Sequence, residues 1–347
     1  MDGIDISLVK TNGINLKRSN KNYFYKYSIE TRNFLLNLLN QDINFILKRK
    51  KILDELITDE HYKALKYFEI INKCDLIGFH GQTIFHFPAI KCSLQLGDPA
   101  KLAKLCNKDV VFEFRAKDIH YGGQGAPLAP IYHKLIIEDH KLELPSCILN
   151  IGGVANITYW DGKSLIGFDT GPGNALMDNF MKKTTNNFFD KNGNLASQGV
   201  AEKKILKRFL NHKFFKKKPP KSLDRNSFLN FYDELTNADL KIPDTMSTLA
   251  EFTIESICLG IKRLPQKVKT IIIAGGGCRN NYLMKCLTEK LDIKFISEND
   301  TYLNFDYIES ELIAFLAARS LYNLPITFPS TTGVSKPLPG GKLQRYL

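Results

Sequence analysis

The chain has 347 residues, more than one hydrophobic core usually organises, so we expect two lobes. Its residues are 44% hydrophobic and 24% charged, which is typical of a soluble protein. No run approaches the roughly 20 apolar residues of a transmembrane helix, and the first residues lack a signal-peptide pattern, so we expect a cytoplasmic protein without a membrane partner. The net charge of +12 is scattered and accompanies no zinc-finger, recognition-helix or RNP pattern, which argues against a nucleic-acid partner. The seven cysteines lack metal-ligand spacing, so we expect reduced thiols.

Strand-like and helix-like patterns alternate along the chain, which predicts an α/β fold. In the first part of the chain we expect a helix over 31–48, a strand that enters a turn over 76–83, a strand over 110–114 and a helix over 128–137. A glycine-rich loop, residues 122–127, precedes this last helix, and its proline stands near the start, where the missing amide costs little.

A new lobe is expected to begin near residue 147. Its predicted strands cover 147–159, 165–169 and 268–274, the first two on either side of an Asp161-Gly162 turn, and its predicted helices cover 174–183, 245–263 and 280–290. We expect a surface connection over 186–198, and an irregular lid or lobe extension over 209–231. A last helix over 309–321 and a glycine- and proline-rich tail over 331–341 complete the chain.

Three glycine-rich turns follow predicted strands, at 150–156, 169–174 and 275–277. Glycines without Cβ atoms let main-chain amides approach phosphate oxygens closely. One such turn is more often simple tight packing, but three at strand ends favour a phosphoryl-transfer site. Asp169 stands beside them as a candidate base. Its other interpretation, a cap for the helix near Asn174, is disfavoured because residues 170–173 separate the two.

Eight motifs, in family order and over almost the whole chain, resemble those of the anhydro-N-acetylmuramic acid kinase family. They are MDGID (1–5), GFHGQT (78–83), QLGD (95–98), FRAKDI (114–119), GGQGAPL (122–128), NIGGVAN (150–156), DTGPGN (169–174) and GGGCRN (275–280).

The resemblance implies a two-lobed, actin-like (ribonuclease H-like) ATPase fold with a nucleotide cleft between the lobes. Lobe one would comprise residues 1–144, completed by elements near 309–347, and lobe two residues 145–308 with the nucleotide-binding turns. The implied activity uses ATP and Mg²⁺ to open 1,6-anhydro-N-acetylmuramic acid with water while phosphorylating O6, which gives N-acetylmuramic acid 6-phosphate for peptidoglycan recycling. The implied partner is therefore a small amino sugar, and a homodimer stays open.

The resemblance also implies residue roles. Asp169 would be the catalytic base. The other implied residues fall into three groups: ATP-binding Asp2, Gly3, Asn150, Gly152, Gly153, Gly275, Gly276 and Gly277; a magnesium ligand, Asp2; and substrate-binding Gln82, Arg115, Gly171, Asn174 and Glu311.

Members of that family normally carry a short strand and a Gly-Thr-Ser turn ahead of the residues that match Asp2 and Gly3. The resemblance therefore predicts a truncated first strand in lobe one and a first phosphate loop without its leading half, and we expect a translation start upstream of Met1. Two other functions stay open: an ATP-binding module or inactive remnant, and a basic protein that binds nucleic acid.

Overall fold

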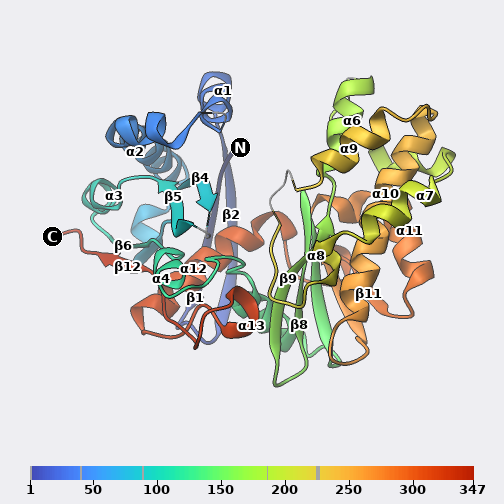
Figure 1. Cartoon of the computed structure of the whole chain (residues 1–347). Coiled ribbons are helices and arrows are strands. Elements are labelled where there is room, and N and C mark those ends of the chain that lie inside the picture. The colour runs from blue at the N-terminus through green and yellow to red at the C-terminus, as the bar shows by residue number, and fades with distance from the viewer. Residues whose placement is uncertain (1, 40, 88–89, 186, 224–226) are drawn as a thin grey trace. The chain divides into compact units, whose positions relative to one another are not determined.

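The computed structural model describes residues 2–39, 41–87, 90–185, 187–223 and 227–347 and divides the chain into two compact units (Figure 1). Unit 1 contains residues 1–135 and 306–347, and unit 2 contains residues 136–305. Each unit combines strands with helices, which confirms the predicted α/β class. In the described part of the chain, no helix is long and apolar enough to cross a membrane.

The strands of unit 1 form one small sheet and two hairpins. The first hairpin pairs β1 (Gly3–Thr11) with β2 (Leu16–Lys26). In the sheet, of order β12-β6-β3, β6 (Asp109–Phe112) runs parallel to β3 (Leu76–Gly78) and antiparallel to β12 (Lys342–Gln344). The second hairpin pairs β4 (Gln82–Phe87) with β5 (Cys92–Leu96).

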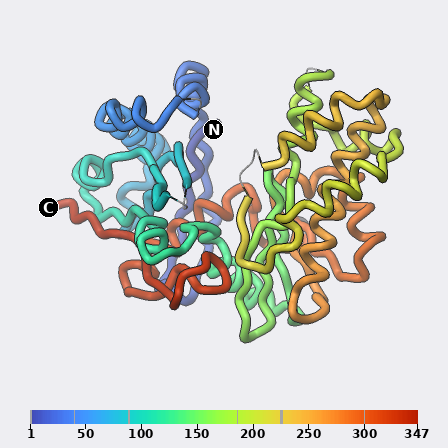
Figure 2. Tube along the Cα trace, viewed as in Figure 1, coloured from blue at the N-terminus to red at the C-terminus, as the bar shows by residue number. Residues whose placement is uncertain are grey.

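The end of the chain returns to the beginning of unit 1. Helix α12 (Ile308–Leu321) contacts β1, β3 and β6, and Figure 2 shows the red C-terminal trace beside the blue N-terminal hairpin. The other helices are α1 (Ile29–Leu38), α2 (Ile43–Tyr67), α3 (Pro99–Cys106), α4 (Ala116–His120) and α13 (Pro329–Thr332), and α5 (Pro130–Asp139) contains the boundary between the units.

The single helix predicted over 31–48 is wrong, because the structure has two helices there. α1 ends at Leu38, and α2 begins after Asp42, whose carboxylate oxygen Oδ1 accepts hydrogen bonds from the main-chain nitrogens of Asn44 at 2.8 Å and Phe45 at 3.0 Å. An aspartate that caps the first free amides of a helix in this way marks a helix start. α2 then continues to Tyr67, well beyond the predicted end.

Unit 2 is built on a five-stranded sheet of order β11-β10-β7-β8-β9. Its strands are β7 (Ser146–Ile151), β8 (Val154–Trp160), β9 (Leu165–Pro172), β10 (Thr270–Ala274) and β11 (Lys294–Ile296). β8 runs antiparallel to both β7 and β9, whereas β7, β10 and β11 are parallel. This is the topology of the actin-like (ribonuclease H-like) ATPase fold that the resemblance implied.

Helix α10 (Ile242–Lys262) is the central helix of unit 2 and contacts β9, β8 and the neighbouring helices (Figure 1). Those helices are α6 (Ala175–Thr185), α7 (Lys203–Leu210), α8 (Lys213–Lys216), α9 (Leu229–Thr236) and α11 (Asn281–Lys290). Fourteen of the residues of α10 are buried, which is why its apolar pattern was readable in the sequence.

The phenylalanine-rich segment 209–231 is partly helical and belongs to the core of unit 2, unlike the irregular lid or extension that we expected. Phe215, Phe228 and Phe231 are buried and surround Phe252 of α10, with ring centroids 5.7, 5.2 and 4.3 Å from it. Parts of four expectations lie outside the described residues: residues 224–226 of this segment, residue 186 of the surface connection, residue 40 of the first helix, and Met1.

Candidate functional site

The three predicted glycine turns lie at one edge of the sheet of unit 2. β7 and β10 are parallel neighbours with Asn150 opposite Ala274, so the turns that follow Ile151 and Ala274 leave the same edge. β9 runs in the same direction as β7, because β8 lies between them and is antiparallel to both. At the end of β9, Pro172 pairs with Val154, beside the first turn. Ligands of open α/β sheets bind at such carboxyl ends of strands.

Asn174 connects the turns. Its main-chain nitrogen donates to the Gly152 carbonyl at 2.7 Å, and its side-chain Nδ2 donates to the Ile151 carbonyl at 3.2 Å. The same Nδ2 is the atom nearest to a Cβ built at Gly276, at 3.9 Å. The main-chain nitrogen of Gly173 adds a bond to the Gly153 carbonyl at 3.0 Å, so the structure brings all three turns together.

The glycines of these turns fall into two classes. A Cβ at Gly275, which has φ +82°, would lie 2.3 Å from Asn150 Oδ1, and a Cβ at Gly277 would lie 2.3 Å from Ile151 Cγ2. Close packing explains both residues. At Gly276 the nearest atom is 3.9 Å from the Cβ position and at Gly152 it is 3.6 Å away, so a Cβ would make only ordinary contacts there and both have an open face. Their bare faces are where a ligand could approach the main chain.

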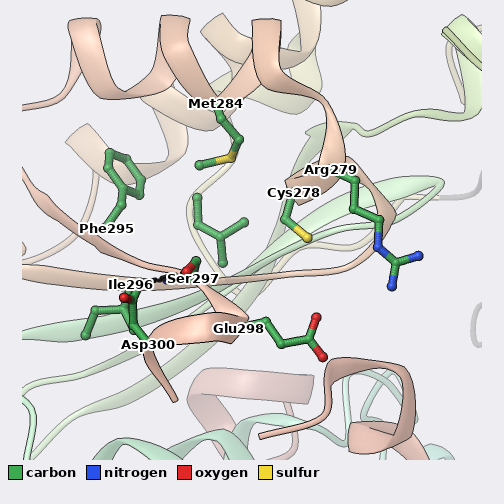
Figure 3. A pocket seen from close by; sticks show the side chains of 9 residues that line it. Cys278, Arg279, Met284, Phe295, Ile296, Ser297, Glu298 and Asp300 are labelled. Atoms are coloured by element: carbon green, nitrogen blue, oxygen red, sulfur yellow. Dashed lines mark hydrogen bonds between the residues drawn. The ribbon is translucent and has the colours of Figure 1, made fainter. Parts of the chain in front are cut away.

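A cavity of about 250 Å³ lies beside the third turn, between β10, α11 and β11 (Figure 3). Met284 of α11 and Phe295 of β11 give it apolar walls, and Arg279 and Glu298 stand together at one side. Glu298 accepts a hydrogen bond from the main-chain nitrogen of Phe305 at 3.0 Å. The full lining is Ile273, Cys278, Arg279, Met284, Phe295, Ile296, Ser297, Glu298 and Asp300. A small apolar cavity with a few polar groups suits a flat ring.

Asp169 lies on β9 at a break in the strand pairing. Ala155 pairs with Gly171 and Asn156 with Asp169, so Thr170 is an extra residue on β9, and such bulges re-aim side chains. The Asp169 carboxylate oxygen Oδ2 accepts a hydrogen bond from the main-chain nitrogen of Leu223 at 2.7 Å. Burial raises the pKa of Asp169 to about 6, against the opposing influences of that bond and of the Lys221 charge. Near neutral pH the carboxylate is ionised and basic enough to accept a proton.

Lys221 and Leu223 are two further residues of the site that were not predicted from the sequence. Both contact Asp169 through the main chain, since the Asp169 nitrogen also donates to the Lys221 carbonyl at 2.9 Å. Lys221 follows a run of lysines within the segment 209–231, yet it is only 5% exposed. No local pattern distinguishes it from its exposed neighbours, so only the three-dimensional structure identifies it.

Arg115 and Gln82 lie in unit 1. Arg115 Nη1 donates to the Gly125 carbonyl at 2.7 Å and its Nε to His80 Nε2 at 3.3 Å. Burial, followed by the Arg115 charge, lowers the pKa of His80 to about 4, so His80 is neutral and can accept that bond while its Nδ1 donates to the Gly81 carbonyl at 3.1 Å. Arg115 Nη2 has no hydrogen-bond partner within the described ranges and is available to an anion. Gln82 is half-buried on β4.

Asp2 and Gly3 stand at the start of β1 in unit 1. The Asp2 carboxylate is 66% exposed and forms an ion pair with Arg32 Nε at 2.8 Å. A Cβ at Gly3 would lie 2.2 Å from the Tyr25 carbonyl oxygen, so the β1–β2 hairpin itself requires glycine there. Across the described residues, no group of three or more histidine, cysteine, aspartate or glutamate side chains is arranged to hold a metal ion.

Glu311 lies on α12 inside unit 1 and is 3% exposed. Its oxygen Oε2 is 2.9 Å from Arg18 Nε and also accepts a short hydrogen bond from the Tyr132 hydroxyl, to which Arg18 Nη2 donates at 2.9 Å. These contacts join β2, α5 and α12. Its role as a substrate ligand stays a prediction.

Replacing Glu311 with glutamine should lower the stability of unit 1 by about 3 kcal/mol, because the guanidinium of Arg18, with 9% of its side chain exposed, would lose its buried ion pair with Glu311. Denaturant unfolding of Glu311→Gln measures the loss. The control is Glu309→Gln, an exposed glutamate of the same helix, which should unfold like the parent protein. An unchanged unfolding midpoint together with a raised KM for the substrate would instead assign Glu311 to substrate binding.

The chain resembles one family throughout. The family model described as anhydro-N-acetylmuramic acid kinase matches residues 1–344. Curated proteins of that name are 40% identical in Rhodopseudomonas palustris, 38% in Bradyrhizobium diazoefficiens and 37% in Zymomonas mobilis, and each alignment covers 99% of this chain and 96% of the relative.

Two solved structures are similar to parts of the chain. The activator of 2-hydroxyisocaproyl-CoA dehydratase from Clostridium difficile with bound ADPNP has a TM-score of 0.32 and 17% identity, over 52% of this chain and 63% of that one. A ligand-bound xylulose kinase from Lactobacillus acidophilus has a TM-score of 0.34 and 12% identity, over 66% and 48%. These TM-scores are too low for either likeness to bear on function.

Proposed function

The chain belongs to the anhydro-N-acetylmuramic acid kinase family and is a sugar kinase, and on this premise we propose the reaction that it catalyses. Water adds to the anomeric carbon of 1,6-anhydro-N-acetylmuramic acid, the bond from C1 to O6 breaks, and O6 takes the γ-phosphoryl group of ATP. The products are N-acetylmuramic acid 6-phosphate and ADP. We propose that this step serves the recycling of peptidoglycan amino sugars in the cytoplasm, where ATP is supplied.

The observation that carries the proposal is the meeting of three glycine turns and Asp169 at one edge of the unit 2 sheet. Main-chain amides at Gly152 and Gly276, with open faces, would approach phosphate oxygens. Asn150, Gly275 and Gly277 would hold the turns in place by close packing, and Gly153 by accepting the hydrogen bond from the Gly173 nitrogen. The cavity beside Met284 and Phe295 would receive the nucleobase. Asp2 and Gly3 of unit 1 complete the proposed set of nucleotide-binding residues.

Asp169 would act as the general base. Its Oδ2 is engaged by Leu223, and Oδ1 has no hydrogen-bond partner within the described residues, which leaves that oxygen for a water molecule. As water attacks C1, its proton passes to Asp169 while positive charge develops at the anomeric carbon. The departing O6 is captured by phosphorus, so no separate carboxylic acid is needed to protonate it. One carboxylate therefore suffices for this chemistry.

Five residues are proposed for the sugar site. We propose Arg115 for the lactyl carboxylate, because its Nη2 is available and its guanidinium geometry suits carboxylates. Gln82 would contact polar groups of the sugar and Glu311 would form part of the wall of the site, with Gly171 and Asn174 close to the base. At Gly171 a Cβ would lie 2.2 Å from Ser256 Oγ, so packing alone already requires glycine there.

Magnesium, when bound, would neutralise developing charge on the transferred phosphoryl group. Mg²⁺ is usually held by one or two carboxylates together with phosphates and water, and the exposed Asp2 is compatible with that role because its second oxygen has no ion-pair partner among the described residues. We therefore propose Asp2 as the magnesium ligand.

The test is a turnover assay with ATP, Mg²⁺ and 1,6-anhydro-N-acetylmuramic acid. We expect ADP release that depends on the sugar, with N-acetylmuramic acid 6-phosphate identified by mass spectrometry. Slow ADP release at the same rate with and without sugar would contradict the proposal and favour an ATP-binding module.

A further inference from the structure

Lys221 is a buried cation whose place in unit 2 calls for an explanation. Its Nζ donates to the Phe214 carbonyl at 3.2 Å and lies 4.2 Å from the centroid of the Phe214 ring. The rings of Phe168 and Phe215 are at 5.8 and 5.9 Å. The ammonium thus has one hydrogen-bond acceptor and three aromatic neighbours, which is a poor replacement for water.

The charged groups around Lys221 do not neutralise its positive charge. Arg263 and Lys217, at the ends of α10 and α8, are cations, and Arg263 Nη1 donates to the Lys217 carbonyl at 3.0 Å. Asp169 is the one carboxylate that influences the pKa of Lys221, and in the described residues no carboxylate lies within ion-pair distance of its Nζ. A methionine would fill this space without the cost of an unpaired buried charge.

The main chain next to Lys221 contacts Asp169 on both sides. The Lys221 carbonyl accepts from the Asp169 nitrogen at 2.9 Å, and two residues later the Leu223 nitrogen donates to Asp169 Oδ2 at 2.7 Å. The Lys221 side chain anchors this segment to α8 through Phe214. The lysine therefore fixes the residues that orient the carboxylate, and it is also the cation that acts on it.

We propose that Lys221 is a positioning residue for Asp169, which acts through the main-chain segment that it anchors and through its positive charge. The inference rests on the proposed role of Asp169 as the base. Lys221 itself need not touch the sugar or ATP.

The proposal predicts a bell-shaped dependence of kcat on pH. The pKa of Asp169 is about 6 because burial raises it, and the pKa of Lys221 is lowered to about 8 by burial and by Arg263. kcat should rise as Asp169 loses its proton near pH 6. It should fall as Lys221 loses its charge near pH 8, because a neutral amine donates more weakly to the Phe214 carbonyl and anchors the segment that orients Asp169 less firmly.

The experiment compares Lys221→Met with the parent protein and with Lys218→Met, which removes an exposed lysine from the same stretch. The first measurement is the titration of the ¹³C carboxyl resonance of Asp169 in the ATP-free protein, assigned with Asp169→Asn. The second is kcat and KM against pH. In Lys221→Met we expect the Asp169 midpoint to rise by about one pH unit, the alkaline fall of kcat to disappear, and both KM values to change less than about twofold. Lys218→Met should behave like the parent.

An unchanged Asp169 midpoint in folded Lys221→Met would overturn the proposal. If Lys221→Met does not fold, Lys221→Gln is titrated instead, and if neither variant folds, Lys221 is a structural anchor and the proposal is wrong. The carboxyl titration needs no substrate. Hence the two proposals can be told apart. If the Asp169 midpoint is raised in Lys221→Met but the parent protein shows no sugar-dependent turnover, the coupling of Lys221 to Asp169 is supported and the proposed function is rejected.

Discussion

Asp169→Asn is expected to lower kcat for the anhydro sugar by about 1,000-fold while ATP still binds with near-normal affinity. The amide can still accept the hydrogen bond that Leu223 donates at 2.7 Å, but it cannot take a proton from water. Steady-state turnover and calorimetric ATP binding measure the two effects. Asp239→Asn, an exposed aspartate of the same unit, is the control and should retain full activity. Near-normal product formation by Asp169→Asn would remove Asp169 from the mechanism.

The same substitution should stabilise unit 2 at alkaline pH. The pKa of Asp169 is raised by burial from 3.8 to about 6 in the folded protein, so its stabilising contribution is complete below about pH 4 and is lost as pH rises through 6. A shift of this size corresponds to about 3 kcal/mol as an order of magnitude. Asparagine has no such loss. The unfolding midpoint of Asp169→Asn should therefore exceed that of the parent protein at pH 8, and the difference should be smaller at pH 4.5. The same difference at both pH values would contradict the raised pKa of Asp169.

Elements with strong local patterns were predictable from the sequence. The isoleucines of β10 are buried on both faces of a central parallel strand, so they form the uninterrupted apolar run that indicated a strand. The buried face of α10 is likewise periodic. The glycine turns were found because glycine is required where backbones approach closely, as at Gly275 and Gly277.

Elements that depend on distant parts of the chain were not predictable. β12 is three residues long and exists because it pairs with β6, more than 200 positions earlier in the chain. The break between α1 and α2 depends on one capping side chain, Asp42, within an otherwise helical pattern. The phenylalanines near residue 215 looked like an irregular extension, because the helix α10 that buries them is distant in sequence.

The candidate site divides in the same way. The pattern indicated the glycine turns and Asp169, but it could not separate Gly276, which has an open face, from Gly275 and Gly277, which packing requires. It also gave no sign that Lys221 is buried, since burial is a property of the folded neighbourhood rather than of the residue type. Roles such as that of Arg115 came from the resemblance, and its available Nη2 is a structural detail that no motif carries.

The difference between Gly275 and Gly276 leads to a paired prediction. Gly275→Ala should destabilise unit 2 by about 3 kcal/mol, because φ is +82° and the new Cβ would meet Asn150 Oδ1 at 2.3 Å. Gly276→Ala should fold normally, since the nearest atom is 3.9 Å from its Cβ. It should nevertheless weaken ATP binding by about tenfold or more, because a methyl group would stand on the open face of the turn where a phosphate or ribose must approach the amides.

Thermal unfolding and ATP titration of both variants separate packing from binding. Gly122→Ala controls for the substitution itself. Gly122 lies in unit 1 at φ +86° with no atom within 4 Å of its Cβ position, so the variant should lose stability through backbone strain without a change in ATP affinity. Normal ATP affinity in a stable Gly276→Ala protein would mean that the third turn does not face the nucleotide. The glycines at 275–277 would then serve only the contact between β10 and Ile151, and the cavity lined by Met284 and Phe295 would lose its proposed ligand.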